Sequence, residues 1–250
     1  MLPPDFKAAE HHVSTHPNSI LKHLSKSDLA LFDGALTAKS FVHGDVLAEA
    51  GSPIDNAYFP NSGLISIVVP LKNGEVIEAG IVGRQDVFGA SAAFGAKTHV
   101  NMAVAQMPGS FSVIKVADLI NAASKSETLR RDLFLHDQFM LAQAQQSAAC
   151  NARHDITQRL ATWLLRVRDR AQQEELTLTQ EFLGQMLGVQ RASVSIAAGA
   201  MQEAGMIQYR RGSIHITDTP KLEQTACECF SVLREQYARA FPVHAAQAAE

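Results

Sequence analysis

Three cysteines and one histidine place thiol and imidazole groups where they could act together. Cys150 and His154 are four residues apart in a predicted helix and so share a face, whereas Cys227 and Cys229 flank one residue near the C-terminus. Thiolate and imidazole bind soft metal ions, and neighbouring thiols can form a redox site. Either chemistry requires the C-terminal segment to fold back onto the helix. Buried cysteines commonly act as small apolar side chains, and we favour that interpretation, so no metal ligand is assigned.

A second set of residues, between positions 177 and 216, has a spacing that constrains the backbone. Gly184, Gly188 and Val194 are residues 5, 9 and 15 counted from Gln180, and the preceding Thr179 is a favoured helix N-cap. A small residue lets two helices cross, a glycine turns the chain without strain, and an apolar side chain anchors the second helix. The spacing therefore predicts a helix-turn-helix.

A basic hairpin follows the second helix, which Gly205 is expected to end. Two alternating runs, 206–209 and 213–216, flank a turn that contains Arg210 and Arg211. A helix-turn-helix followed by such a β-wing is a winged helix, whose second helix can enter the major groove of DNA. The alternative is a sensory or scaffold protein whose winged helix contacts another protein.

The residues expected to face outward from this unit are suited to DNA. Arg191 can donate two hydrogen bonds to guanine O6 and N7, whereas Arg210 and Arg211 on the wing would contact phosphates. Ala192 and Ile196 would lie beside Arg191 on the outer face of the second helix. The predicted DNA-binding residues are Gln190, Arg191, Ser193, Ser195, Thr179, Arg210 and Arg211.

The elements that must position these side chains can be read from changes in composition along the chain. Residues 1–40 are polar and predicted helical, whereas residues 41–117 are rich in Val, Ile, Phe and Gly. Recurring glycines split the second stretch into short strands, and Asn73-Gly74 between apolar runs is a strong hairpin signal. An antiparallel β-roll or jelly roll is predicted there, so the fold class is α+β.

A long helix over 123–152 follows the β-roll and carries two apolar stripes. One stripe would face the helix's own domain, and the other would pair with the same helix of a second subunit. The stripe assigned to the dimer consists of Leu129, Leu133, His136, Met140, Gln143 and Ser147. The stripe beside it consists of Leu135, Phe139, Ala142, Gln146 and Ala149. A monomer with one broad buried face is the alternative.

A β-roll, a long helix and a winged helix, in this order, resemble the Crp/Fnr family of bacterial transcription regulators. The resemblance covers about residues 20–220 and rests on the segments LTQEFLGQMLGVQRASVS, FVHGDVLAEAGSPIDNAYFPNSG and GRQDVFG. It implies a cyclic-nucleotide-binding-like sensor domain at 1–122, a dimerisation helix at 123–152, a DNA-binding domain at 153–218 and an added helical segment at 219–250. It also implies a homodimer on a palindromic promoter site, an effector sensed by the β-roll and, for an activator, contact with RNA polymerase.

Departures from the family pattern bear on the effector. Members that bind cyclic nucleotides carry Gly-Glu after the Phe of the roll and Arg-Ser downstream, but here Ala90 follows Gly89 and no Arg lies near Thr98. Without those charged partners, neither cyclic AMP nor cyclic GMP is expected to bind tightly. The candidate pocket consists of Arg84, Phe88, Gly89, Ala90, Thr98 and His99.

Other cofactors of the family find little support. The N-terminal segment has no cysteine, so an iron–sulfur cluster is not expected. A haem ligand would have to be His43, His99 or His136, and nothing in their spacing singles one out. The effector, the operator and the sign of regulation stay open.

Composition and charge set the remaining bounds. The net charge is −3 and 46% of the residues are hydrophobic, which excludes a mostly disordered chain. Residues 153–216 hold eight Arg and six acidic residues, so the predicted DNA-binding part is positive although the whole chain is not. No apolar run is long enough to span a membrane and no signal core begins the chain, so a cytoplasmic location is expected. A cupin-like metalloenzyme using His43 and Glu49 would have too few imidazoles, and no catalytic residue is assigned.

Overall fold

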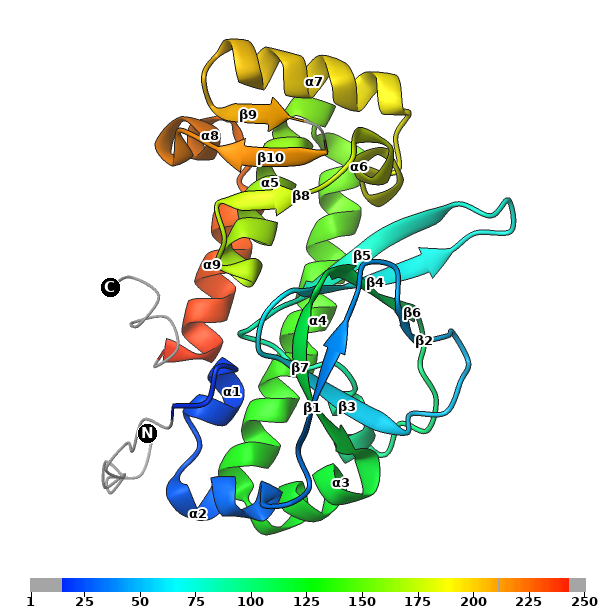
Figure 1. The fold of residues 1–250 in the computed structure, drawn as a ribbon, viewed down its shortest axis with the longest axis vertical. Coiled ribbons are helices and arrows are strands. Elements are labelled where there is room, and N and C mark those ends of the chain that lie inside the picture. The colour runs from blue at the N-terminus through cyan, green and yellow to red at the C-terminus, as the bar shows by residue number, and fades with distance from the viewer. Residues whose placement is uncertain (1–14, 211, 243–250) are drawn as a thin grey trace.

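The computed structural model describes residues 15–210 and 212–242 and begins with short helical segments against the β-roll (Figure 1). Asn18 caps the first of them, because its Oδ1 accepts hydrogen bonds from the backbone N–H groups of Ile20 and Leu21. Its amide also donates to Pro60 O and Asp86 O, at 3.0 and 2.9 Å, and so fastens this segment to the roll. The segments are α1 (Ser19–Lys22), α2 (Lys26–Leu29) and the 3-10 helix η1 (Ala30–Phe32).

Two antiparallel sheets form the β-roll, which confirms the predicted fold class. The strand order is β1-β7-β3 in one sheet and β2-β6-β4-β5 in the other. Ile65, Val82 and Phe111 belong to one buried cluster that joins the two sheets. The strands are β1 (Thr37–Phe41), β2 (Val46–Ala48), β3 (Asn56–Pro60), β4 (Leu64–Pro70), β5 (Val76–Val82), β6 (Met102–Met107) and β7 (Gly109–Lys115), with η2 (Ala90–Phe94) between β5 and β6.

The hairpin predicted at Asn73-Gly74 joins β4 to β5. Gly74 has a φ of 87°, which glycine adopts without the strain that a side chain would add. Leu71 N donates to Glu75 O at 2.8 Å to close the turn, and Pro70 pairs with Val76 at the start of the ladder. The hairpin projects from the right-hand side of the molecule in Figure 1.

Two helices, α3 (Val116–Lys125) and α4 (Glu127–Arg153), follow the roll where a helix over 123–152 was expected. Ser126 separates them, and its Oγ accepts a hydrogen bond from Leu129 N at 3.0 Å, which caps α4. The long helix therefore starts at a defined N-cap and extends past Ala152.

Most residues of the two apolar stripes of α4 are covered by other parts of the described chain, although Ala149 is exposed. The residues assigned to the dimer contact include Leu129, Leu133, His136 and Gln143, which are buried, and Met140 and Ser147, which are partly buried. Leu129 and Leu133 pack with the core of the sensor domain, and Phe139 on the other stripe packs with Leu233 and Tyr237. The stripe assigned to a second subunit thus faces the β-roll, and the C-terminal segment folds back onto the other stripe.

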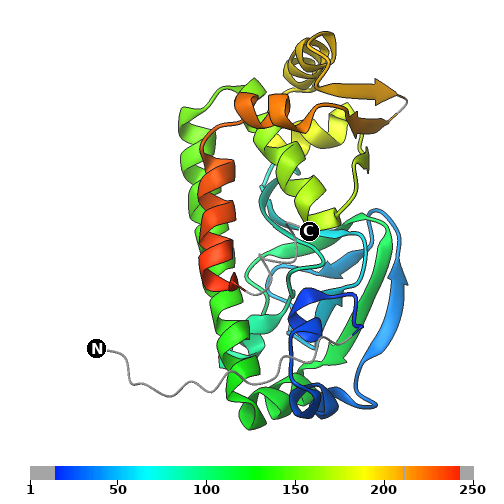
Figure 2. The same ribbon diagram turned by 90° about the vertical axis from the view of Figure 1, so that its left-hand side faces the viewer.

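The C-terminal part contains the predicted helix-turn-helix and wing, at the top of Figure 1. A three-stranded sheet with the order β8-β10-β9 supports them. The last helix, α9, returns along α4, as Figure 2 shows. The elements are α5 (Ile156–Ala171), β8 (Glu175–Thr177), α6 (Gln180–Leu187), α7 (Arg191–Glu203), β9 (Ile207–Arg210), β10 (Ser213–Ile216), α8 (Thr219–Thr225) and α9 (Cys229–Ala240).

One hydrophobic core crosses the boundary between the β-roll and the winged helix. Leu64 and Ile81 of the roll belong to the same buried cluster as Leu164 of α5 and Leu183 of α6. The two parts therefore pack directly on each other in this conformation. Within residues 15–210 and 212–242, no helix has the length and apolar character needed to cross a membrane.

Candidate nucleic-acid interface

The crossing of α6 and α7 depends on the three residues whose spacing predicted it. A Cβ atom at Gly184 would lie 2.9 Å from Val189 O, so any larger residue would push the helices apart. Gly188 ends α6 with a φ of 63°, in the left-handed region that glycine tolerates. Val194 is fully buried in the shared core. This local geometry sets the position of α7 relative to α6.

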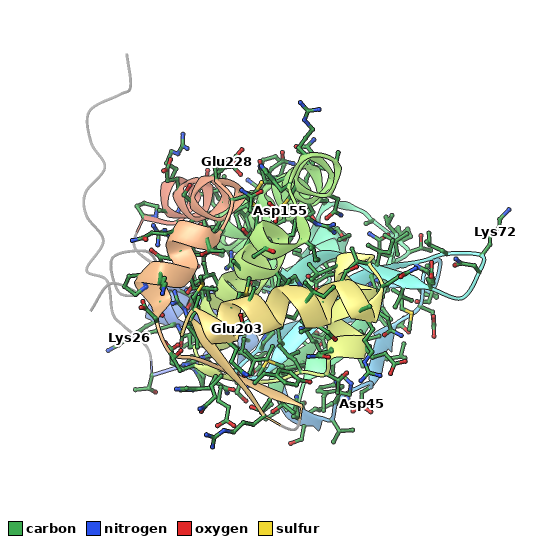
Figure 3. The ribbon with its side chains drawn as sticks, turned by 90° about the horizontal axis from the view of Figure 1, so that it is seen from above. Lys26, Asp45, Lys72, Asp155, Glu203 and Glu228 are labelled. Carbon is green, nitrogen blue, oxygen red and sulfur yellow. The ribbon has the colours of Figure 1, made fainter. Side chains whose placement is uncertain are left out.

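The outer face of α7 is turned away from the rest of the chain. Seen from above in Figure 3, this helix lies across the top of the molecule, with Glu203 near its C-terminal end. Arg191 and Ala192 are exposed, and Ile196 has a relative exposure of 75%. Gln190 is the exposed N-cap residue and its side chain makes no capping bond. An exposed arginine followed by small and apolar side chains suits contact with base edges and thymine methyl groups.

Two predicted DNA contacts have structural roles within the helix-turn-helix. Thr179 caps α6 by accepting a hydrogen bond from Phe182 N at 3.1 Å. Ser195 Oγ donates to Gln180 Oε1 at 2.6 Å and so links α7 to α6. The hydroxyl of Ser195 is therefore engaged within the chain, because one turn of α7 brings it over the start of α6.

The remaining predicted contacts lie at the start of α7 and on the wing. Ser193 is half-buried, while Arg210 is exposed at the end of β9. Arg210 is the register partner of Ser213, so it stands at the tip of the β9–β10 hairpin. Arg211 lies outside the described residues.

A buried ion pair joins α5 to the β-roll. Arg170 Nη1 donates to Asp86 Oδ1 at 2.9 Å, and the Asp86 carboxylate is fully buried. Burial raises the pKa of Asp86, but the Arg170 charge and a hydrogen bond from His136 outweigh it and hold the pKa below its usual value. The Arg170 guanidinium also lies 5.0 Å from the ring centroid of Phe139 and 4.5 Å from that of Tyr237.

A second buried contact between the two parts centres on Glu78 in β5. Its Oε1 accepts a hydrogen bond from Trp163 Nε1 and its Oε2 accepts one from Ser66 Oγ, both at 2.8 Å. Burial raises the pKa of this carboxyl to about 7, although the nearby Arg166 lowers it. Because Trp163 and Arg166 lie on α5, Glu78 holds the winged helix to the roll. The sequence analysis missed this residue, although an acid within the apolar run 76–82 was a signal.

The residues of the predicted effector pocket have separate surroundings. Phe88 and His99 stack with their ring centroids 5.0 Å apart, and both are buried. Ala90 is buried as well, Gly89 has a left-handed φ of 91°, and Thr98 is exposed.

Arg84 points away from the roll and toward α5. Its Nη1 donates to Gln172 Oε1 at 2.5 Å and its Nη2 donates to Pro17 O at 3.3 Å. A shallow groove of the roll beside the stacked pair is lined by Glu49 and Asp55. These carboxylates would repel a phosphate group.

Each histidine considered as a haem ligand is held by a neighbouring group. His43 Nδ1 lies 2.7 Å from Gln106 O, and His136 Nε2 lies 3.3 Å from Asp86 Oδ1. His99 is stacked as described above. The cupin-like arrangement around His43 belongs to no group of converging metal ligands among the described residues.

The fold does bring the three cysteines and His154 to one place. Because α9 returns along α4, Cys227 Sγ lies 3.5 Å from Cys150 Sγ and Cys229 Sγ lies 3.6 Å from His154 Nδ1. The hydrogen bond from Cys150 outweighs burial and, with one from Thr162, lowers the pKa of the Cys227 thiol to about 5. The fold-back on which a metal or redox site depended is therefore present.

Two domain families match the chain in the order that the fold shows. A cyclic nucleotide-binding domain family matches residues 38–126, and the Crp-like helix-turn-helix domain family matches residues 158–225. A comparison with curated protein sequences finds no match.

Several solved regulators have a similar fold. FixK2 from Bradyrhizobium japonicum has a TM-score of 0.67 at 21% identity, with 77% of this chain and 98% of that chain covered. TTHB099, a CRP family transcriptional regulator from Thermus thermophilus, has a TM-score of 0.63 at 21% identity, with coverage of 75% and 96%. The c-di-GMP responsive global regulator CLP from Xanthomonas campestris has a TM-score of 0.61 at 16% identity, with coverage of 77% and 99%.

A sensor roll followed by a long helix and a winged helix defines a class of DNA-binding transcription regulators. With both of its domain families matched in that order, the chain belongs to the Crp/Fnr family.

Proposed function

We propose that this regulator binds a palindromic promoter site as a homodimer, with one α7 in each of two successive major grooves. The observation that carries the proposal is the exposed outer face of α7, which begins at Arg191 and continues through Ala192 and Ile196. Arg191 would contact a guanine, while Arg210 and Arg211 on the wing would contact phosphates. The protein acts in the cytoplasm on promoter DNA and carries out no catalytic step.

The dimer would form through the face of α4 that residues 15–210 and 212–242 leave exposed. Phe134 and Leu141 have relative exposures of 50% and 52%, and Ala148 is exposed too. These residues are seven apart, so they share one face of the helix. Phe94 packs edge-on against Phe134, with ring centroids 5.8 Å apart, and widens this apolar face. Exposed apolar surface of this kind favours contact with a second copy of α4.

Regulation would act on the contacts between the roll and α5. A signal that loosens the Asp86–Arg170 pair would let the winged helices shift toward the arrangement that fits the operator. We expect neither cyclic AMP nor cyclic GMP to be the effector, because Glu49 and Asp55 line the groove and no arginine is among its described lining residues. An activator would in addition contact RNA polymerase.

Selection of binding sites from random duplex DNA, followed by fluorescence anisotropy, tests the proposal. We expect a palindrome whose half-sites lie about 34–36 Å apart, and an affinity that falls steeply as salt rises. Arg191→Ala should weaken binding by about 1–3 kcal/mol and relax the choice at one base position in each half-site. Arg234→Ala, which removes an exposed arginine on α9, should leave the selected sequence unchanged.

Two results would oppose the proposal in different ways. An unchanged sequence preference in Arg191→Ala would remove that residue from base recognition. No salt-dependent DNA binding at all would indicate a winged helix that contacts protein.

Calorimetric titration with cyclic AMP and cyclic GMP tests the effector assignment separately. We expect no heat of binding at micromolar ligand concentrations, because the groove offers carboxylates where a phosphate would need a positive charge. Micromolar or tighter affinity would contradict this part of the proposal.

A further inference from the structure

We propose that Cys150, His154, Cys227 and Cys229 form a tetrahedral zinc site that fastens α9 to the junction of α4 and α5. Their potential ligand atoms all lie within 4.8 Å of one another. Three cysteines and one histidine are a ligand set of structural zinc sites, which use four protein ligands and keep no open position. The site is separate from the proposed DNA-binding face, so this proposal does not depend on the function proposed above.

Two of the distances between the ligand atoms are close to those of a tetrahedral site. With Zn–S bonds of about 2.3 Å and a Zn–N bond of about 2.0–2.1 Å, a tetrahedron separates two sulfurs by about 3.8 Å and a sulfur from a nitrogen by about 3.6 Å. The observed separations are 3.5 Å from Cys150 Sγ to Cys227 Sγ and 3.6 Å from Cys229 Sγ to His154 Nδ1. All three cysteines are free thiols.

The histidine is oriented as a metal ligand requires. His154 Nε2 lies 3.2 Å from Glu228 Oε2, so the ring nitrogen away from the cluster has a carboxylate partner. That contact leaves Nδ1 directed at Cys229 Sγ with its lone pair available. A carboxylate behind the histidine fixes its tautomer and strengthens it as a ligand.

The sulfurs are surrounded by hydrogen-bond donors. Gln146 Nε2 donates to Cys229 Sγ, and Thr162 Oγ1 lies at the same 3.0 Å distance from Cys227 Sγ. Cys229 is also the first residue of α9, where the helix dipole favours a negative charge. These groups would donate hydrogen bonds to thiolates, which are the form that binds metal.

Packing alone does not account for the cluster. In the part of the chain that the structure describes, the three cysteines form a small buried cluster among themselves, apart from the main hydrophobic cores. Small apolar side chains would be expected to fill gaps between larger ones. Mutual contact between thiols is instead what a shared ion requires.

The location gives the site a mechanical role. His154 ends α4 and Asp155 caps α5, so the cluster lies at the point where the long helix meets the winged helix. Figure 3 labels Asp155 and Glu228, which flank this junction as seen from above. An ion here would hold the start of α9 in place, and with it Tyr237, which packs on Arg170.

Metal analysis of the full chain is the first test. The protein would carry a purification tag without histidine and would never meet a chelator. We expect about one zinc per chain, and we expect Co²⁺ added to the metal-free protein to give the absorption of a tetrahedral thiolate complex. Cys150→Ser and Cys227→Ser should lose both signals, whereas His215→Ala on the exposed side of the wing should keep them.

A conservative variant outside the four ligands tests the zinc site even if the cysteine variants fail to fold. Glu228 is 71% exposed, so Glu228→Gln should fold normally yet bind zinc about 10- to 100-fold more weakly in competition with a chromogenic chelator. Glu235→Gln, an exposed position on the same helix, should bind as the unchanged protein does. Removing zinc should also speed hydrogen exchange in α9.

Three results would each overturn the proposal. In the first, the protein is folded and its cysteines are reduced, but it takes up no zinc, and its thiols react with a thiol reagent equally fast with and without added zinc. Another is stoichiometric iron with inorganic sulfide. The third is equal zinc affinity in Glu228→Gln and Glu235→Gln.

Discussion

Single glycines decide how closely the two helices of the helix-turn-helix, α6 and α7, approach each other. Gly184 has Val189 O at 2.9 Å from where a Cβ would be, whereas the equivalent space around Gly199 on α7 is open. Two glycines in one small unit therefore have opposite sensitivity to the same substitution.

Gly184→Ala should lower the free energy of unfolding by about 1–3 kcal/mol and weaken DNA binding, because the added methyl displaces α7. Gly199→Ala should raise stability by about 0.5–1 kcal/mol, since alanine is the better helix residue. Urea unfolding of both variants checks the pair. Equal stability of Gly184→Ala and the unchanged protein would mean that the crossing of α6 and α7 has room for an added methyl group.

Glu78 makes stability depend on pH. Its folded pKa of about 7 exceeds the ordinary value of 4.5, so the folded state holds the proton more tightly. Glu78 therefore contributes about 3 kcal/mol at most to the free energy of unfolding. This contribution is fully present below pH 4.5 and is lost as the pH rises through about 7.

Glu78→Gln, which can still accept from Trp163, should lack this dependence. We expect the free energy of unfolding of the unchanged protein to fall relative to that variant between about pH 5 and 8, as measured by urea titration at several pH values. Parallel profiles for the two proteins would show that Glu78 does not titrate in this range.

At the scale of elements, α4 packs against two parts of the described chain and leaves one apolar face exposed. Its buried stripes face the roll and α9, and the uncovered face carries Phe134 and Leu141. The sequence analysis recognised that two stripes need two partners. It assigned one stripe to another subunit, because no local pattern around Cys229–Ala240 shows that this helix returns along α4.

Phe134→Glu combined with Leu141→Glu should convert a dimer to a monomer, because two carboxylates from each chain would face each other across the contact. Light scattering after size-exclusion chromatography measures the mass. Val100→Glu is the matched control, since Val100 is 87% exposed on the roll and lies off α4. A dimer that survives the double substitution would place the subunit contact elsewhere.

At the scale of the whole molecule, the roll and the winged helix share one hydrophobic core. We therefore expect the two parts to unfold together. Trp163 is the sole tryptophan of the chain and donates to Glu78 across this contact, so its fluorescence reports on the contact itself. Circular dichroism reports on the helices as a set. The two signals should therefore share one unfolding midpoint.

Arg170→Ala should separate those midpoints. It leaves the buried Asp86 carboxylate without its charge partner, at a cost of about 3–5 kcal/mol, and the tryptophan signal should change first. Arg168→Ala is the control, because Arg168 bonds to Asp169 and Thr219 within the winged-helix part. Coincident midpoints in Arg170→Ala would mean that the ion pair does not hold the two parts together.

The helix-turn-helix, the wing and the Asn73-Gly74 hairpin could be predicted from the sequence because their causes are local. Glycine conformation, short spacing and alternating strands act within a few residues. The exposed position of Arg191 and Ile196 follows from the same helix periodicity.

Long-range contacts were decided only by the tertiary structure. Glu78 meets Trp163 across 85 positions, and Cys150 meets Cys227 across 77, so no local pattern could reveal either pairing. The return of α9 along α4 covers the stripe that contains Phe139, while the stripe assigned to a second subunit faces the roll. The same return brings the separate cysteines into one cluster. Local spacing determined the helix-turn-helix and its exposed outer face, because its causes act within a few residues. The burial of distant residues against one another decided how that unit is held against the roll.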